Sequence, residues 1–173
     1  MKVKFKGIPV NLSGDFICKD AIAPNFRMAK DDLSDFTLAL AKGKTLVLNI
    51  FPSLDTDVCA MSVRKFNEIA GSLKNTLVLC ISKDLPFAQK RFCTTENIKN
   101  VIALSDCRLN SAFGLDYGVE ISSGMFEGLL TRAQIIISPE GIVKYAQLTP
   151  EIEKEPDYDA VLNVLYNKPK SVL

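Results

Sequence analysis

Residues 45–73 read TLVLNIFPSLDTDVCAMSVRKFNEIAGSL, and this stretch decides the fold. The run from Thr45 to Phe51 is almost continuously apolar, which is typical of a strand covered on both faces. Residues 60–73 have the spacing of an amphipathic helix. Cys59 is therefore expected in the first turn of a helix, just past the carboxyl end of a strand. Free backbone N–H groups and the helix dipole favour an anion there, and the thiolate is the reactive form of cysteine.

Cys59 also begins the apolar stripe of this predicted helix. Val63, Phe66, Ala70 and Leu73 follow it at steps of four and three residues, so all of them share one face. The sulfur is thus expected at the rim of the core, close to water but shielded on one side. Burial disfavours the charged thiolate, so a nearby cation is needed to tip the balance toward it.

The rest of the chain alternates strands and helices around this unit. Residues 1–12 alternate around a Gly-Ile-Pro turn and predict a short hairpin. Further strands are expected at 76–82, 101–104, 133–137 and 142–148, helices at 84–93, 109–113 and 157–166, a short strand or turn at 34–40, and a long loop at 115–130. This order predicts an α/β protein with a thioredoxin-like fold, in which helices flank a central mixed β-sheet and the N-terminal β-hairpin is an addition. The length predicts a single domain over residues 1–173.

Two aspartates mark helix starts. Asp84 precedes Leu85 and Pro86 and is expected to cap the helix that follows. Asp157 follows Pro156 and is expected to cap the last helix in the same way.

The overall composition excludes several classes of partner. The net charge is +1, with 21 basic and 20 acidic residues, so no electrostatic attraction to nucleic acid or to an anionic membrane is expected. We find neither a run long enough to span a membrane nor the apolar region of a signal peptide. A cytoplasmic location is the resulting expectation.

The cysteine and histidine counts restrict the chemistry further. There are five cysteines and no C-x-x-C pair, which argues against a disulfide framework and against a zinc site. Histidine is absent from the sequence, which excludes a Cys-His dyad, a Ser-His-Asp triad and any histidine metal ligand. Backbone dipoles and a cation must therefore activate Cys59.

Three other residues are candidates for shaping the site. Thr56 lies three residues before Cys59, where its hydroxyl can face the sulfur. Pro52 ends the strand and can close one side of the pocket. Arg132 precedes a buried run and is the obvious distant cation, because arginine stays charged when partly buried. The sequence does not place Arg132 beside Cys59, and each residue also suits a plain role in a cap, a turn or an ion pair.

The remaining cysteines need separate interpretations, and Cys59 itself also suits simple core filling. Cys80 lies inside an apolar strand and is expected in the core, and Cys18 and Cys107 are also interpreted as structural. Cys93 ends a short helix that can unfold locally, so its sulfur could attack an oxidised Cys59. The residues alone leave Cys93 and Cys107 about equal as that second sulfur.

At this point the residues match a known family. Pro52, Thr56 and Cys59 fit the pattern P-x-x-x-T-x-x-C, which is the peroxiredoxin signature. The longer string PSLDTDVCAMSVRKFN resembles the bacterial thiol peroxidase subfamily, as do RFC at 91–93, GLLTRA at 128–133 and EPDY at 155–158. The four blocks occur in the right order, and the resemblance covers nearly the whole chain.

The resemblance implies an atypical two-cysteine peroxiredoxin that reduces hydrogen peroxide and alkyl hydroperoxides without a cofactor or a metal. Cys59 would be the peroxidatic cysteine and Cys93 the resolving cysteine, joined in an intrachain Cys59–Cys93 disulfide. Thr56 and Arg132 would polarise the peroxide and hold the thiolate, and Pro52 would shield the site. The usual reductant in this family is thioredoxin, and the usual assembly is a homodimer.

Two other functions compete with this one. A non-enzymatic thiol redox sensor would relay oxidation to a partner protein, but the sequence shows no partner segment. A disulfide isomerase or reductase is disfavoured by the missing C-x-x-C. For the peroxidase, the loop at 115–130 is expected to line the pocket with Met125, Phe126, Leu129 and Leu130, which suggests tolerance for alkyl hydroperoxides.

Overall fold

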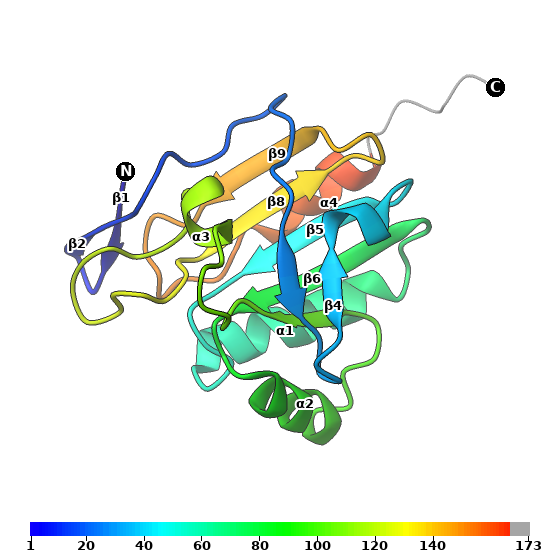
Figure 1. Cartoon of the computed structure of the whole chain (residues 1–173), viewed down its shortest axis with the longest axis horizontal. Helices are drawn as coiled ribbons and strands as arrows, with labels where there is room; N and C mark the ends of the chain where they lie inside the picture. Colours follow the sequence, from blue (N-terminus) through cyan, green and yellow to red (C-terminus); the bar gives the residue numbers. More distant parts are fainter. Residues whose placement is uncertain (167–173) are drawn as a thin grey trace.

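The computed structural model describes residues 1–166 of the chain. Its centre is a seven-stranded mixed sheet in the order β4-β3-β7-β6-β5-β8-β9, and β1 and β2 form a separate two-stranded sheet (Figure 1). The strands are β1 Lys2–Phe5, β2 Ile8–Asn11, β3 Arg27–Ala29, β4 Asp35–Thr37, β5 Thr45–Ile50, β6 Thr76–Ser82, β7 Ile102–Ser105, β8 Ala133–Ile137 and β9 Val143–Leu148. The helices are η1 Leu38–Ala41, α1 Asp57–Ala70, α2 Pro86–Thr95, α3 Phe113–Asp116 and α4 Tyr158–Tyr166. Within these residues no helix combines the length and the apolar composition needed to cross a membrane.

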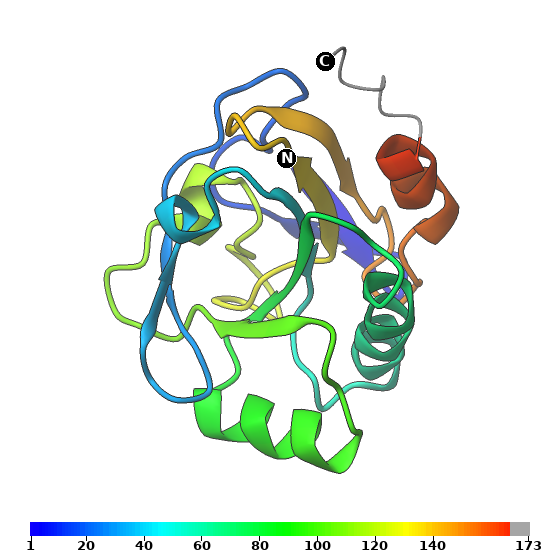
Figure 2. The ribbon, with the colours of Figure 1, turned by 90° about the vertical axis from the view of Figure 1, so that its right-hand side faces the viewer.

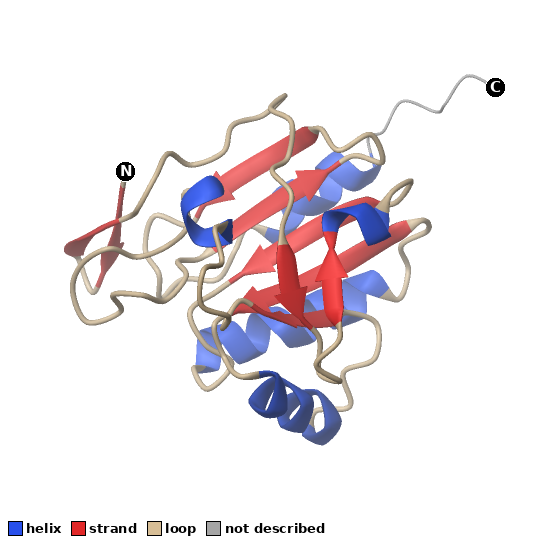
Figure 3. Cartoon of the chain, viewed as in Figure 1, coloured by secondary structure: helices blue, strands red, loops and turns tan. Residues whose placement is uncertain are grey.

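Helices and loops cover both faces of the central sheet. Figure 2 shows α1 and α4 on one side of the sheet, with η1 and α3 on the other, and Figure 3 shows how much of the second side is loop. Under α1 and α4, Phe66 and Val161 pack against Val47 and Ile136 of the sheet. The alternate residues of the same strands pack toward η1 and α3, as Leu48 and Ile135 do. The expected thioredoxin-like α/β fold with an added N-terminal hairpin is thus confirmed.

Strand β5 is the middle of this sheet and explains the apolar run in the sequence. It pairs in parallel with β6 and antiparallel with β8, and all six of its residues are buried. Because both faces of the strand are covered, neither set of alternate side chains needs to be polar. Parallel pairing of β5 with β6 also requires a crossover, which α1 supplies.

The N-terminal hairpin packs at one end of the sheet. β1 and β2 pair antiparallel, with Lys4 opposite Pro9. Lys2, Lys4 and Lys6 are exposed, while the alternate Val3 is buried in a small apolar cluster with Val10, Leu12, Ile121 and Ile152. The alternation of charged and apolar residues thus matches a strand with one solvent-exposed face and one face packed on the protein.

Two details of the sheet differ from the sequence expectation. Strand β3, Arg27–Ala29, was not expected, because its three residues carry no alternating pattern; pairing with β4 and β7 makes it a strand. The short helix expected at 109–113 is wrong in position, since α3 covers Phe113–Asp116. A single helical turn has too little periodicity to be located within a few residues.

The two expected helix caps have different outcomes. The Asp157 carboxylate accepts a hydrogen bond from the N–H of Ala160 at 2.9 Å, as expected for a cap. The expectation for Asp84 is wrong, because Leu85 occupies the cap position of α2 and makes no side-chain cap bond. The carboxylate of Asp84 is engaged elsewhere.

Asp84 ties the loop before α1 to the end of β6. Its carboxylate accepts hydrogen bonds from the Ser53 hydroxyl at 2.7 Å, the Leu54 N–H at 2.8 Å and the Ser82 hydroxyl at 2.7 Å. The Ser82 oxygen in turn accepts a hydrogen bond at 3.1 Å from the side-chain amide of Gln89, which lies on α2. One carboxylate therefore holds two loops that flank the sheet edge.

Replacing Asp84 by asparagine is expected to lower the free energy of unfolding by about 1–3 kcal/mol, because one acceptor oxygen becomes an NH₂ group that faces donors. Denaturant unfolding of the reduced protein measures this change. Asp55→Asn removes an exposed carboxylate from the same loop and is the control, with an expected change below about 0.5 kcal/mol. Equal stability of the two variants would show that the Asp84 contacts contribute nothing.

Candidate functional site

Cys59 is the third residue of α1, directly after the loop that leaves β5. Its side chain is 1% exposed and packs with Phe51, Leu54, Val63 and Cys80. The backbone N–H groups of the first helical turn are free of intrahelical partners and carry the positive end of the dipole. The expected place of this cysteine, at a helix start and on the rim of the core, is the place it occupies.

Arg132 lies against the sulfur of Cys59. Its Nη2 donates a hydrogen bond to Cys59 Sγ at 3.2 Å, and its Nε donates one to the backbone oxygen of Ile152 at 2.9 Å. The side chain is 1% exposed. Nη1 is also buried and has no hydrogen-bond partner among residues 1–166. One donor of the guanidinium is therefore available to a molecule that enters the site.

The register of the sheet explains why a residue so distant in sequence reaches Cys59. β8 runs antiparallel to β5, with Ala133 opposite Ile50. Arg132 precedes β8 and so emerges beside the carboxyl end of β5, where the loop to α1 begins. Strand pairing supplies the neighbour that the sequence left open.

A buried guanidinium is costly unless an anion faces it. Cys59 Sγ is the group that Arg132 Nη2 contacts. The site thus places a positive charge and the free N–H groups of a helix start beside the sulfur, in a chain that contains no imidazole.

A cavity of about 360 Å³ opens beside Cys59. Pro52, Thr56 and Arg132 line it together with the sulfur, and Phe5, Phe126 and Glu153 are part of its wall. The structure thus brings Cys59 together with Pro52, Thr56 and Arg132, the three residues that the sequence indicated as candidates for shaping the site. The Thr56 hydroxyl donates to the Ser53 backbone oxygen at 3.1 Å rather than to the sulfur, so reaching a bound substrate requires rotation of its side chain.

The apolar wall of the cavity differs from the expectation. Of the four residues expected from the loop at 115–130, only Phe126 lines the cavity. Met125 is 88% exposed, and Leu130 is buried in the main core.

Phe5 completes this wall and was not expected there. Its ring meets that of Phe126 edge to face, with centroids 4.7 Å apart. Phe5 lies between the exposed Lys4 and Lys6, and only the docking of the hairpin places its ring in this wall.

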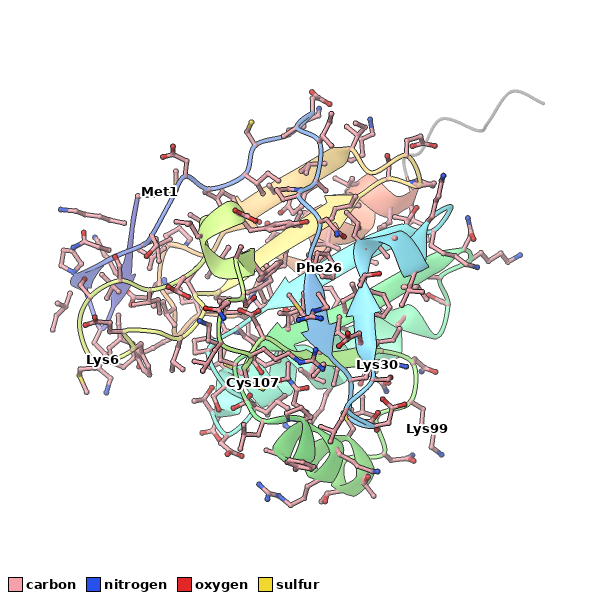
Figure 4. The ribbon with its side chains drawn as sticks, viewed as in Figure 1. Met1, Lys6, Phe26, Lys30, Lys99 and Cys107 are labelled. Carbon is pink, nitrogen blue, oxygen red and sulfur yellow. The ribbon has the colours of Figure 1, made fainter. Side chains whose placement is uncertain are left out.

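Cys93 lies apart from this cavity. It is the eighth residue of α2 and half-buried, and it opens onto a second cavity of about 190 Å³ lined by Lys30, Asp31 and Lys99. Figure 4 shows Lys30 and Lys99 well separated from Lys6, which follows Phe5 in the hairpin. Burial, and to a lesser degree the charge of Asp31, raises the pKa of Cys93 above its ordinary value.

All five cysteines are free thiols in this structure. The preceding residue, Phe92, packs against the cluster around Cys59, whereas Cys93 faces the second cavity. The structure therefore shows a reduced state in which the two candidate redox sulfurs do not meet.

The other cysteines divide into one core thiol and two nearer the surface. Cys80 is 1% exposed, as expected for a strand interior, and burial raises its pKa to about 12. It therefore stays protonated near neutral pH and is a poor nucleophile although it packs close to Cys59. Cys107 is half-buried and Cys18 is exposed, and the interpretation of both as structural residues stays a prediction.

Comparisons with known proteins show the family to which this chain belongs. The Redoxin family model matches residues 19–162. A curated thiol peroxidase of Corynebacterium glutamicum is 48% identical over 164 residues, which cover 95% of this chain and 98% of that protein.

Solved structures show the same relationship. A peroxiredoxin-like protein from Aquifex aeolicus is 43% identical and superposes with a TM-score of 0.90 over 95% of each chain. A thiol peroxidase from Chromobacterium violaceum superposes with a TM-score of 0.87 over 96% of each chain, and at 22% identity it supports the fold alone. From the family match and the 48% identical relative, the chain belongs to the Redoxin family and is a peroxiredoxin-type oxidoreductase.

Proposed function

We propose that this chain reduces hydrogen peroxide and organic hydroperoxides to water and alcohols, with Cys59 as the peroxidatic cysteine. The observation that carries the proposal is the contact of 3.2 Å between Arg132 Nη2 and Cys59 Sγ, at the wall of a cavity large enough for a small substrate. The 48% identical relative named thiol peroxidase supports thiol-dependent peroxidase activity.

In the first step, the Cys59 thiolate attacks one oxygen of the hydroperoxide. A sulfur–oxygen bond forms and the oxygen–oxygen bond breaks, so the sulfur is oxidised by two electrons to a sulfenic acid. The leaving alkoxide or hydroxide takes a proton and departs as an alcohol or as water.

Arg132 and Thr56 are the proposed partners of the peroxide oxygens. The free, buried Nη1 of Arg132 can donate to an oxygen on which charge develops. The Thr56 hydroxyl can join it after leaving the Ser53 oxygen. Pro52, which is buried and has no N–H, closes the cavity beside the sulfur and keeps water off it.

In the second step, the Cys93 thiol condenses with the sulfenic acid. A Cys59–Cys93 disulfide forms and one water molecule leaves. Because the two cysteines face different cavities in the reduced state, the start of α1 and the end of α2 must both move first.

The return to the reduced state needs a dithiol reductant. Thioredoxin is the proposed donor, and thiol–disulfide exchange with it would occur in a reducing compartment such as the cytosol. We also propose that the working assembly is a homodimer, as the family resemblance implies.

Two serine variants distinguish the proposed role of Cys59 from that of Cys93. Cys59→Ser is expected to abolish peroxide turnover with thioredoxin and its reductase, because the attacking sulfur is gone. Cys93→Ser is expected to consume one equivalent of peroxide and then stall as the sulfenic acid, which dimedone labelling and mass spectrometry detect. Cys18→Ser, an exposed cysteine, is the control. Undiminished turnover by Cys59→Ser would overturn the peroxidase proposal, and a disulfide from Cys59 to Cys107 would overturn the role of Cys93.

Arg132→Lys is expected to slow the reaction with peroxide about 10- to 100-fold, because a lysine can replace the charge but not the second donor of the guanidinium. Quenched-flow alkylation of Cys59 measures the rate constant. Arg27→Lys changes an exposed arginine in the same way and should leave the rate within about twofold. Equal rates in both variants would contradict the proposed role of Arg132.

Asp31→Asn tests the electrostatics of Cys93. In the reduced protein, burial and Asp31 hold the pKa of Cys93 above its ordinary value, so the thiolate forms only as the pH rises through that raised pKa. Removing the Asp31 charge should move the midpoint of Cys93 alkylation to lower pH, as followed by peptide mapping. Asp32→Asn, which changes a neighbouring exposed carboxylate, is the control, and an identical midpoint in both variants would rule out a specific effect of Asp31.

A further inference from the structure

A short segment, residues 150–152, lies between the N-terminal hairpin and Arg132. On one side, the Lys4 N–H donates to the Pro150 oxygen at 2.8 Å, and the Ile152 N–H donates to the Lys4 oxygen at 2.9 Å. On the other side, the Ile152 oxygen accepts a hydrogen bond from Arg132 Nε at 2.9 Å. Hydrogen bonds thus run without a break from the hairpin to the guanidinium that contacts Cys59.

The register of the hairpin leaves Lys4 free to make these bonds. Opposed pairs in an antiparallel ladder alternate between hydrogen-bonded and non-hydrogen-bonded pairs, and because the Leu12 N–H bonds to the Met1 oxygen, Lys4 and Pro9 form a non-hydrogen-bonded pair. Both backbone groups of Lys4 therefore point away from β2 to residues 150–152, where Lys4 forms a parallel bridge with Glu151. A third contact, from the Gly7 N–H to the Glu151 carboxylate at 3.3 Å, joins the turn of the hairpin to the same segment.

Apolar packing holds the segment in the same place. The side chain of Ile152 is 3% exposed and shares a cluster with Val3 and Val10 of the hairpin. The backbone oxygen of Ile152 is consequently held in place by the packing of its residue on the hairpin and by its hydrogen bond with Arg132 Nε. Without the hairpin, residues 150–152 would lose both their backbone partners and their apolar cover.

We propose that the hairpin is a positioning element for Arg132 and that Lys4 and Ile152 are its positioning residues. The inference rests on the proposed role of Arg132 in the reaction with peroxide. The hairpin does not touch the sulfur; it fixes the Ile152 oxygen, which fixes Nε.

The physical reason lies in the shape of the arginine side chain. Four rotatable bonds separate the guanidinium from the backbone, but one hydrogen bond at Nε sets the plane of the whole group. With Nε held, Nη2 points at Cys59 and Nη1 remains free for the substrate. A guanidinium that pivots loses this orientation, and misplacement of a catalytic group by about 1 Å can cost up to about 10²-fold in rate.

Lys4→Pro tests the proposal, because it removes the N–H that binds Pro150. Proline is tolerated where a strand N–H points away from its own ladder. We expect the rate constant for oxidation of Cys59 by hydrogen peroxide to fall about tenfold. Lys2→Pro is the matched control: it places the same residue on the same strand, two positions away from the bridge to Glu151. It should leave the rate within about twofold.

A double-mutant cycle shows whether the effect passes through Arg132. If the hairpin acts by orienting the guanidinium, Lys4→Pro should slow an Arg132→Lys protein by less than about twofold, because lysine has no Nε–H to hold. A full tenfold loss in that background would overturn the proposal, and so would equal rates for Lys4→Pro and Lys2→Pro. If Arg132→Lys alone has no effect, the proposed role of Arg132 fails instead, which separates the two failures.

A second variant covers the case in which Lys4→Pro does not fold. Val3→Ala shortens a buried side chain that packs in the cluster of Ile152 and keeps every hydrogen bond of Lys4. A smaller loss of rate is expected, with a native far-ultraviolet spectrum, and this loss should likewise disappear in an Arg132→Lys background. An unchanged rate in a folded Val3→Ala protein, or a loss of rate that persists in the Arg132→Lys background, would count against the hairpin as a positioning element.

Discussion

The site depends on one contact, the hydrogen bond from Nη2 of the buried Arg132 side chain to the sulfur of Cys59. Burying either charged group without the other would be energetically unfavourable. Burial disfavours the thiolate, and a buried arginine without an anion is costlier still. Together with the free N–H groups of the first turn of α1, they form a pair that needs no histidine, which the chain lacks. The sheet register that sets Ala133 opposite Ile50 is what makes this pair possible.

Hydrogen bonds hold the segments around Cys59 in place, but the proposed reaction requires these segments to move. Asp84 collects three hydrogen bonds from the Cys59 loop and from β6, and Ser82 passes the connection to α2 through Gln89. The proposed disulfide nevertheless requires α1 and α2 to loosen, because Cys93 faces a different cavity. A network of a few polar contacts at the sheet edge is suited to such a compromise, since its bonds can be exchanged for bonds to water. The apolar cores on the two faces of the sheet have no such exchange available.

The N-terminal hairpin contributes to the site through its packing. As an isolated two-stranded sheet it would be marginal in water, so its stability comes from packing on Ile152 and Ile121. That packing places Phe5 in the cavity wall and holds the Ile152 oxygen against Arg132. A small addition to the thioredoxin-like plan therefore touches both the shape of the cavity and the orientation of its cation.

Local patterns in the sequence were sufficient for much of this. The apolar run of β5, the stripe that begins at Cys59 and the alternation in the hairpin each depend on neighbours within a few residues, and each predicted its element. The absence of histidine, with the match at Pro52, Thr56 and Cys59, was enough to indicate a thiol nucleophile activated by other means. The three-residue strand β3 was not predicted, and the single-turn helix α3 was predicted at the wrong position. Segments this short have no periodicity of their own. Asp84 was misassigned because its partners at positions 53 and 54 are distant in the sequence.

What the sequence by itself determined was therefore the candidate nucleophile, most of the elements around it and the family. Only the tertiary structure decided which cation meets the sulfur, which aromatic side chains form the wall and which cavity Cys93 faces. Those relations are contacts between segments separated by tens of residues. Strand register and the docking of the hairpin set them, and no local pattern of residues encodes either.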